Sequence, residues 1–283
     1  MKYIDHGDKV EITNLSDFDL AKTFECGQCF RWNADENGVY TGIAFDRVLA
    51  LQQCGNSIIL SCTAEDFDNI WRNYFDLDRD YAAIRQQLCV DDFMHRATEF
   101  GAGIRLLRQD KWEALCSFII SQNNNIPRIK SIIETLCTCF GEKLVSGSKE
   151  YFSFPCAHRL ASVSMDDLEP LRCGYRAAYI ANAAGAVASG VIDLDFLSGC
   201  TPAVARAALM TLCGVGSKVA DCVLLFGFNM LDVFPLDVWI KRAVSEHFDK
   251  DFDPGIFHPY AGIAQQYIFH FTRNGIEKYF TTK

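Results

Sequence analysis

The spacing of apolar residues changes once along the chain. In residues 8–62 apolar and polar positions alternate between turn signals, of which Asn37-Gly38 is the strongest. From residue 64 onward apolar residues recur every three or four positions, as on one face of a helix. The pattern predicts an α+β fold, with an antiparallel sheet domain and flanking helices over residues 1–100 and a helical domain over residues 101–283.

Capping residues place the ends of two helices in the middle of the chain. Asp110 precedes one apolar helical segment, and Asn125 precedes another, which has Pro127 near its start and Gly141 at its end. The loop between them holds three consecutive asparagines, 123–125, which favour neither helix nor strand. Two interpretations remain open: a simple polar loop, or amide side chains that hydrogen-bond to base edges.

A helix, a tight turn and a second helix are predicted between residues 202 and 226. Apolar residues recur with a helical period over 202–212, Gly214-Val215-Gly216 forms the turn, and an apolar segment follows from Ser217. Glycines at 214 and 216 permit positive φ and close backbone approach, so the amides of the turn can face a phosphate. This helix-hairpin-helix pattern indicates a sequence-independent grip on a nucleic-acid backbone.

Lys218 lies in the first turn of that second helix, and the residues after it are almost all apolar. A lone lysine at a helix start is ordinarily solvated surface, but this helix must be buried. Desolvation and the positive end of the helix dipole both disfavour the ammonium form, which favours a nucleophilic amine. Asp237 precedes another helix, where one carboxylate can serve both as an N-cap and in catalysis.

Composition excludes several classes of protein. The 283 residues are 49% hydrophobic, and no apolar run reaches the roughly 18 residues of a membrane span. Because the N-terminus is unlike a signal peptide, we expect a soluble intracellular protein with no membrane partner. The 13 cysteines are odd in number and lack zinc-like spacing, which indicates reduced core thiols. No cysteine follows Cys222, which excludes a C-terminal four-cysteine iron–sulfur cluster.

The net charge of −9 argues against a nucleic-acid partner, but the charges are unevenly distributed. Residues 61–100 carry nine acids against four arginines, whereas residues 101–150 carry seven basic residues against five acids. We therefore expect a local basic face. A second polar cluster, Gly174-Tyr175-Arg176, could wedge a Tyr into a base stack, although Tyr-Arg pairs are common on surfaces.

Seven motifs, in order through almost the whole chain, resemble the 8-oxoguanine DNA glycosylase/lyase family. They are Gly27 to Trp32, Arg105 to Asp110, Asn123 to Arg128, Gly174 to Arg176, Gly214 to Cys222, Pro235 to Asp237 and Tyr260 to Gln265. Each motif is weak alone, but seven in sequence are specific. The resemblance implies a TATA-binding-protein-like sheet domain joined to a helix-hairpin-helix glycosylase domain, and a role in base-excision repair.

The resemblance also implies how catalysis and strand opening would be shared among residues. Lys218 would attack the sugar C1′ and form a Schiff base, and Asp237 would stabilise the positive charge on the sugar. Tyr175 would fill the gap left by the flipped base. The orphaned cytosine would be contacted by Asn123, Arg128 and Arg176. Gly214 and Gly216 would form the phosphate-binding turn.

Recognition of the damaged base is implied by a further set of residues. The oxidised base carries N7–H where guanine has an acceptor, so the backbone carbonyl of Gly27 would attract one base and repel the other. Phe269 and Cys222 would sandwich the ring, and Gln265 would hydrogen-bond its Watson–Crick edge. For Phe269, ordinary core packing is an open alternative.

Three positions depart from the family pattern. Cys213 stands where the hairpin usually has Pro, Trp239 where a His is often found, and Ser217 where Thr is usual. The indole N–H of Trp239 could replace the His in a phosphate contact. Family members often hold a structural monovalent or divalent cation through hairpin carbonyls, which here belong to Met210, Leu212 and Val215. We expect no other cofactor.

The leading hypothesis is a monomeric, bifunctional glycosylase and abasic-site lyase acting on double-stranded DNA that contains 8-oxoguanine opposite cytosine. One alternative is a monofunctional alkylated-base glycosylase, against which Lys218 argues, because a water-activating mechanism needs Asp237 but no lysine. The other is a non-catalytic helix-hairpin-helix DNA-binding protein, against which the presence of both residues argues. The absence of targeting segments favours a prokaryotic cytoplasm, at the nucleoid.

Overall fold

The computed structural model describes residues 2–13, 15 and 17–275. These residues form two compact units, and each unit is assembled from separate stretches of the chain. Unit 1 comprises Met1–Gln28, Leu51–Arg108 and Asn229–Lys283, and unit 2 comprises Cys29–Ala50 and Gln109–Phe228. The sequence-based division between residues 100 and 101 stays a prediction.

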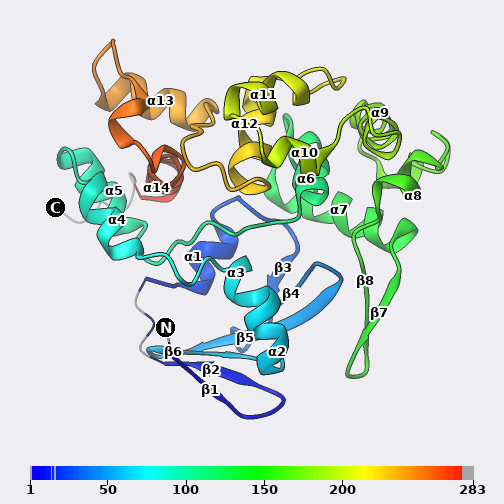
Figure 1. The fold of residues 1–283 in the computed structure, drawn as a ribbon, viewed down its shortest axis with the longest axis horizontal. Coiled ribbons are helices and arrows are strands. Elements are labelled where there is room, and N and C mark those ends of the chain that lie inside the picture. The colour runs from blue at the N-terminus through cyan, green and yellow to red at the C-terminus, as the bar shows by residue number, and fades with distance from the viewer. Residues whose placement is uncertain (1, 14, 16, 276–283) are drawn as a thin grey trace. The chain divides into compact units, whose positions relative to one another are not determined.

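The predicted N-terminal antiparallel sheet is confirmed. Its strands are β1 (Tyr3–Asp5), β2 (Val10–Ile12), β3 (Trp32–Ala34), β4 (Tyr40–Ala44), β5 (Arg47–Cys54) and β6 (Ser57–Leu60), in the order β1-β2-β6-β5-β4-β3 (Figure 1). Val10 pairs with Leu60 and Ile12 with Ile58, and these four side chains are all buried on one face, which fixes the register. Between β3 and β4, Gly38 has φ +75° and Asp35 N donates to Val39 O at 2.9 Å, which confirms the predicted hairpin.

Unit 1 contains nine helices and helical turns among the described residues, and the longest of them, α14, is largely buried. They are α1 (Leu20–Glu25), α2 (Ala64–Asp66), a π turn (Phe67–Trp71), α3 (Arg72–Tyr74), α4 (Tyr81–Leu88), α5 (Asp92–Phe100), α13 (Val238–His247), a 3-10 turn (Pro254–Phe257) and α14 (Ala261–Asn274). α14 packs against α5 and α13 (Figure 1). From Ala261 to Thr272 every side chain except that of Phe269 is buried.

Unit 2 contains the predicted helical segments. They are α6 (Lys111–Ser121), α7 (Ile126–Phe140), α8 (Ala157–Ala161), a 3-10 turn (Glu169–Leu171), α9 (Arg176–Ala188), α10 (Leu194–Ser198), α11 (Pro202–Leu209) and α12 (Ser217–Phe226). Asp110 and Asn125 cap α6 and α7 with their side chains, and α7 ends at Gly141, as predicted. A hairpin of β7 (Lys143–Ser146) and β8 (Lys149–Phe152) interrupts the helices and was not predicted.

The cysteines bear out the prediction of reduced thiols, because all 13 lack a disulfide. Seven of them are buried, among them Cys116, Cys137 and Cys222, but Cys213 is exposed in the hairpin turn rather than in an apolar segment. Within the described ranges, no helix combines the length and apolar character that crossing a membrane requires.

Candidate active site

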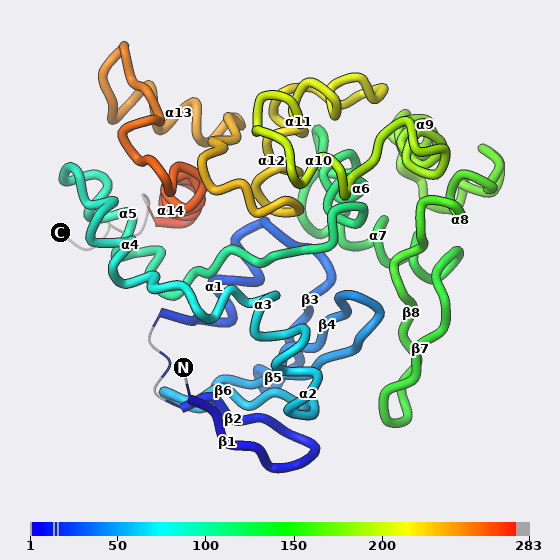
Figure 2. The backbone as a smooth tube through the Cα atoms, in the orientation of Figure 1, coloured from blue at the N-terminus to red at the C-terminus, as the bar shows by residue number. Residues whose placement is uncertain are grey.

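The predicted helix-hairpin-helix in unit 2 is α11, a turn and α12 (Figure 2). The first helix ends at Leu209, three residues earlier than expected, and Val215 N donates to Leu212 O at 3.1 Å to close the turn. Gly214 has φ +78°, and a Cβ there would lie 2.2 Å from the ring of Tyr179. Gly214 is therefore required for two reasons, its backbone conformation and the close approach of an aromatic ring.

The second glycine of the turn differs from the sequence prediction. Gly216 has φ −90°, and a Cβ there would meet no atom within 4 Å. It is the N-cap residue of α12, and it offers no side chain to the first amides of that helix. These amides therefore depend on other acceptors, which suits the binding of a phosphate at this helix start.

Lys218 is half-buried in the first turn of α12, and its ammonium lies over an aromatic side chain. Lys218 Nζ is 5.6 Å from the ring centroid of Phe118, which is itself buried and stacks on Phe226 with centroids 5.3 Å apart. After Lys218 every residue of α12, from Val219 to Phe226, is buried, as predicted. Cys222 follows Lys218 by one helical turn and is 4% exposed, so both residues lie on the same face of α12.

The three asparagines between α6 and α7 have different roles. Asn125 caps α7 by accepting from Arg128 N at 3.0 Å, and Asn124 donates to Ile120 O at 3.1 Å. Asn123 is exposed and adopts φ +47°, and its side-chain amide donates a long hydrogen bond of 3.4 Å to the Tyr175 hydroxyl. Asparagine adopts this region of φ more readily than most non-glycine residues, so the polar-loop and base-edge interpretations both stay open for Asn123.

Tyr175 and Arg176, at the start of α9, are held in unlike ways. Tyr175 is 49% exposed, as a wedge residue must be. Arg176 is 5% exposed, and its guanidinium donates to the carbonyls of Gln122, Asn123 and Cys173. Arg176 therefore fixes the asparagine loop through its backbone, and its direct contact with a base stays a prediction. Arg128 is exposed and donates to Arg172 O at 3.2 Å.

In unit 1, two buried glutamines hold the backbone on either side of Gly27, which has φ +84°. Gln266 Nε2 donates to Cys26 O at 2.8 Å, and Gln28 Nε2 donates to Thr23 O and Arg105 O, each at 2.8 Å. The sequence analysis did not single out either glutamine. The available signal was a polar residue inside a segment that is otherwise apolar, which indicates a buried hydrogen bond.

α14 carries two of the predicted base-binding residues one turn apart. Gln265 is 5% exposed, and its buried Oε1 has no hydrogen-bond partner within residues 2–13, 15 and 17–275. A buried acceptor without a partner is costly to stability and indicates a site that a ligand completes. Phe269 is the one side chain of the buried stretch that is only half-buried, which argues against ordinary core packing.

The structure confirms the predicted role of Asp237 as a helix N-cap. Asp237 is half-buried and caps α13, with Oδ1 accepting from Ile240 N at 2.8 Å. Trp239, which stands in place of the more usual His, is 38% exposed and so is accessible to a partner. Gly27, Asp237, Gln265 and Phe269 belong to unit 1, whereas Lys218 and Cys222 belong to unit 2. That these two sets act on one base stays a prediction.

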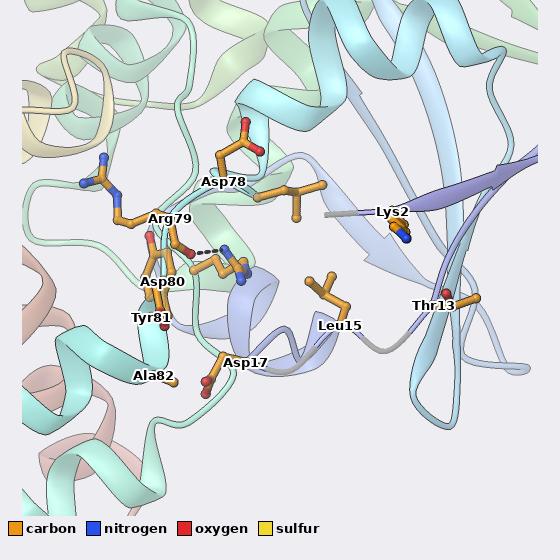
Figure 3. Close-up of a pocket in the computed structure, with 11 residues that line it drawn as sticks. Lys2, Thr13, Leu15, Asp17, Asp78, Arg79, Asp80, Tyr81 and Ala82 are labelled. Atoms are coloured by element: carbon orange, nitrogen blue, oxygen red, sulfur yellow. Dashed lines mark hydrogen bonds between the residues drawn. The ribbon is translucent and has the colours of Figure 1, made fainter.

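A cavity of about 520 Å³ in unit 1 contains none of the predicted site residues. Figure 3 shows Asp78 and Tyr81 among its lining side chains. Asp78 accepts from Arg72 at 2.7 Å, and the Tyr81 hydroxyl donates to Asp76 at 3.0 Å. Because these polar groups are paired within the protein, the cavity's polar lining serves the fold.

A second cavity, of about 400 Å³ in unit 2, is lined by Arg31 and Glu113. Arg31 Nη1 lies 3.5 Å from Glu113 Oε2, and both side chains are largely buried. Burial raises the pKa of Glu113 to about 7, against the opposing effect of Arg31. This ion pair joins Arg31, which directly precedes β3, to Glu113 of α6, so it gives the arginine of the first motif a structural role.

Known proteins match the chain along most of its length. Residues 11–115 match the family model of the 8-oxoguanine DNA glycosylase N-terminal domain, and residues 116–253 match that of the HhH-GPD superfamily of base excision DNA repair proteins. The N-glycosylase/DNA lyase of Saccharomyces cerevisiae is 32% identical over 261 residues, which cover 83% of this chain and 69% of the yeast protein.

Solved structures agree with these matches. MBOgg1 in complex with a low-affinity DNA ligand is 45% identical, with a TM-score of 0.91 over 96% of this chain and 99% of that one. The Clostridium acetobutylicum 8-oxoguanine glycosylase/lyase, in complex with double-stranded DNA containing cytosine opposite 8-oxoguanine, is 36% identical, with a TM-score of 0.91 over 96% and 98% of the two chains. The chain belongs to the 8-oxoguanine DNA glycosylase/lyase family.

Proposed function

We propose that this chain removes 8-oxoguanine opposite cytosine from double-stranded DNA and then cleaves the strand 3′ to the abasic site, with Lys218 as the nucleophile. The observation that carries the assignment is Lys218 itself. It lies in the first turn of the buried helix α12, directly after a glycine turn suited to phosphate, with its Nζ held 5.6 Å from the Phe118 ring.

The chemistry proceeds through a covalent intermediate. The Lys218 ammonium first gives up a proton to water, and the resulting amine attacks C1′ and loses a second proton, while the bond from C1′ to the base breaks and the base leaves with the electron pair and gains a proton. Opening of the sugar ring then gives a Schiff base. Loss of the C2′ proton breaks the C3′–O bond and releases the 3′ phosphate. The Asp237 carboxylate stabilises the positive charge that develops on the sugar.

Lesion recognition would use hydrogen-bonding groups that guanine cannot satisfy. The carbonyl of Gly27 accepts from the N7–H of the oxidised base, and it would face a repulsive acceptor in guanine. The partnerless Oε1 of Gln265 supports its role, because the purine Watson–Crick edge supplies the missing donor. Phe269 and the Cys222 side chain would enclose the ring from its two faces.

The loop between α6 and α7 and the start of α9 would contact the opposite strand and fill the gap left by the flipped nucleotide. Tyr175 is exposed and would take the space of the flipped nucleotide. Asn123 and Arg128 are exposed and would hydrogen-bond to the unpaired cytosine. Arg176 would contribute chiefly by fixing the carbonyls of Gln122 and Asn123, to which it already donates.

No organic cofactor enters this scheme, and the protein would act as a monomer at the nucleoid of a cytoplasm. A structural cation would be held by the carbonyls of Met210, Leu212 and Val215. Leu212 O already accepts from Val215 N, and a carbonyl oxygen has a second lone pair for a cation. Such a cation would fix the hairpin carbonyls and take no part in the reaction.

Borohydride trapping tests the proposal. We expect wild type to form a covalent adduct with duplex carrying 8-oxoguanine opposite C, and none with guanine opposite C. Lys218→Gln should abolish the adduct while still binding damaged DNA, and Lys149→Gln, at an exposed lysine of β8, should trap like wild type. Base release without an adduct would indicate a monofunctional glycosylase, and neither product would indicate a DNA-binding protein without catalysis.

A further inference from the structure

We propose that Asn182, on α9, is a positioning residue that holds the hairpin turn between α11 and α12 in its DNA-binding conformation. Its carboxamide Oδ1 accepts from the backbone N–H of Cys213 at 2.9 Å, from 31 residues away in sequence. The inference rests on the proposed function, because it assigns the turn to phosphate binding.

The Asn182 contact differs in kind from the other hydrogen bonds of the turn. Among the described residues, the other backbone hydrogen bonds of this turn join near neighbours, such as Leu212 N to Leu209 O and Val215 N to Leu212 O, each at 3.1 Å. Local bonds of this kind shape a turn but do not fix its orientation relative to another helix. Asn182 supplies that link directly to the backbone.

Tyr179 adds a second contact from the same face of α9. Its ring lies against Gly214 so closely that a Cβ there would be 2.2 Å from Cδ2. Tyr179 also packs edge-on to Tyr175, with ring centroids 5.4 Å apart. Tyr175, Tyr179 and Asn182 are four and three residues apart, so they share one helical face. α9 thus sets the spacing between the proposed wedge and the proposed phosphate-binding turn.

The residue at position 213 explains why this chain needs such a link. Family members usually have Pro there, which fixes φ and has no N–H. Cys213 restores a backbone donor and loosens φ in an exposed turn. The Asn182 side chain satisfies that donor and restrains the same peptide from outside. Asn182 and Cys213 therefore act together as a replacement for the proline.

A double-mutant cycle tests this pairing with wild type, Asn182→Ala, Cys213→Pro and the double variant. The measurements are the Kd for undamaged duplex DNA across a salt series and the maximal borohydride-trapping rate on lesion duplex. Asn182→Ala should raise Kd about three- to tenfold, the equivalent of one neutral hydrogen bond. It should also make the salt dependence of Kd shallower, because fewer phosphates are bound.

The decisive comparison is made in the Cys213→Pro background, where the N–H is absent and Asn182→Ala should change Kd less than twofold. A loss of the same size in both backgrounds would overturn the proposal, as would an unchanged Kd in the single variant. The effect should fall on Kd rather than on the maximal trapping rate. Wild type that binds DNA but fails to trap would refute the proposed chemistry alone, since the Kd cycle would still report on the turn.

Discussion

The Gly27 turn (Cys26 to Gln28) and the hairpin turn (Cys213 to Gly216) are built around the same device, a glycine with positive φ, yet they are held differently. Gly27 has φ +84° between Cys26 and Gln28, which are 1% and 0% exposed. Gly214 has φ +78° between residues of a turn whose ends, Cys213 and Gly216, are exposed. The first turn is fixed by buried glutamines and the second by an exposed asparagine.

The difference agrees with what each turn would bind under the proposed function. A carbonyl that distinguishes N7–H from a bare N7 must be immobile, because a small shift would allow either base. Hydrogen bonds inside the protein give that rigidity, since breaking them leaves buried groups unsatisfied. Amides that bind a phosphate must instead face outward, so their support comes from one side only. The Gly27 turn should therefore be costly to perturb, and the hairpin turn much less so.

The largest effect is expected for Gln28→Ala. Gln28 donates to Thr23 O and Arg105 O and accepts from Leu107 N at 2.9 Å, all in the buried interior of unit 1. Alanine removes one hydrogen bond from each of these three backbone groups, although Thr23 O keeps the weaker bond from the Cys26 thiol. At roughly 1 kcal/mol or more for each lost bond we expect a loss of about 3 kcal/mol. Urea denaturation measures this loss. A change below about 1 kcal/mol would mean that the Gly27 turn is held by something else.

A smaller effect is expected for Gly214→Ala in the hairpin turn. Alanine there must adopt φ +78° and displace the Tyr179 ring, which should lower stability by about 2 kcal/mol and weaken binding to undamaged duplex DNA. Gly216→Ala is the matched control, because its φ is −90° and its surroundings are open. Equal changes in Tm and Kd for the two variants would contradict the distinction between these glycines.

The sequence predicted features that depend on neighbouring residues. Asp110, Asn125 and Asp237 each cap the helix that follows, because capping needs only a short polar side chain and the next three amides. It did not distinguish Gly214 from Gly216. Either glycine can adopt either sign of φ, and the choice depends on Tyr179, which lies 35 positions earlier in the chain.

Contacts between residues far apart in the sequence account for the other differences between the predictions and the structure. Contact of Arg176 with the orphaned cytosine stays a prediction, but the sequence did not reveal that its guanidinium donates to carbonyls of the loop more than 50 residues earlier. The β7–β8 hairpin was missed because its strands are mostly exposed and so lack an alternating apolar face. The resemblance supplied Gln265 as a ligand-binding residue. Only the structure reveals that its Oε1 lacks a partner.

The smallest changes in stability are expected on substitution of two adjacent glutamines of α14. Comparing these two variants is also the sharpest test of the Gly27 turn. Gln266→Met removes the hydrogen bond to Cys26 O and should destabilise the protein by about 1 kcal/mol. Gln265→Met removes a buried acceptor that has no partner, so stability should stay equal or rise by up to about 1 kcal/mol.

The loss of activity should be larger for Gln265→Met than for Gln266→Met, which is the reverse of the order expected for the loss of stability. Gln265→Met should slow the release of 8-oxoguanine at least tenfold, although the protein is no less stable, because the purine edge loses its acceptor. Thermal denaturation and single-turnover base release, measured on both variants, separate the two effects. If Gln265→Met lost as much stability as Gln266→Met, Oε1 would have a partner inside the protein, and the case for Gln265 as a reader of the damaged base would fail.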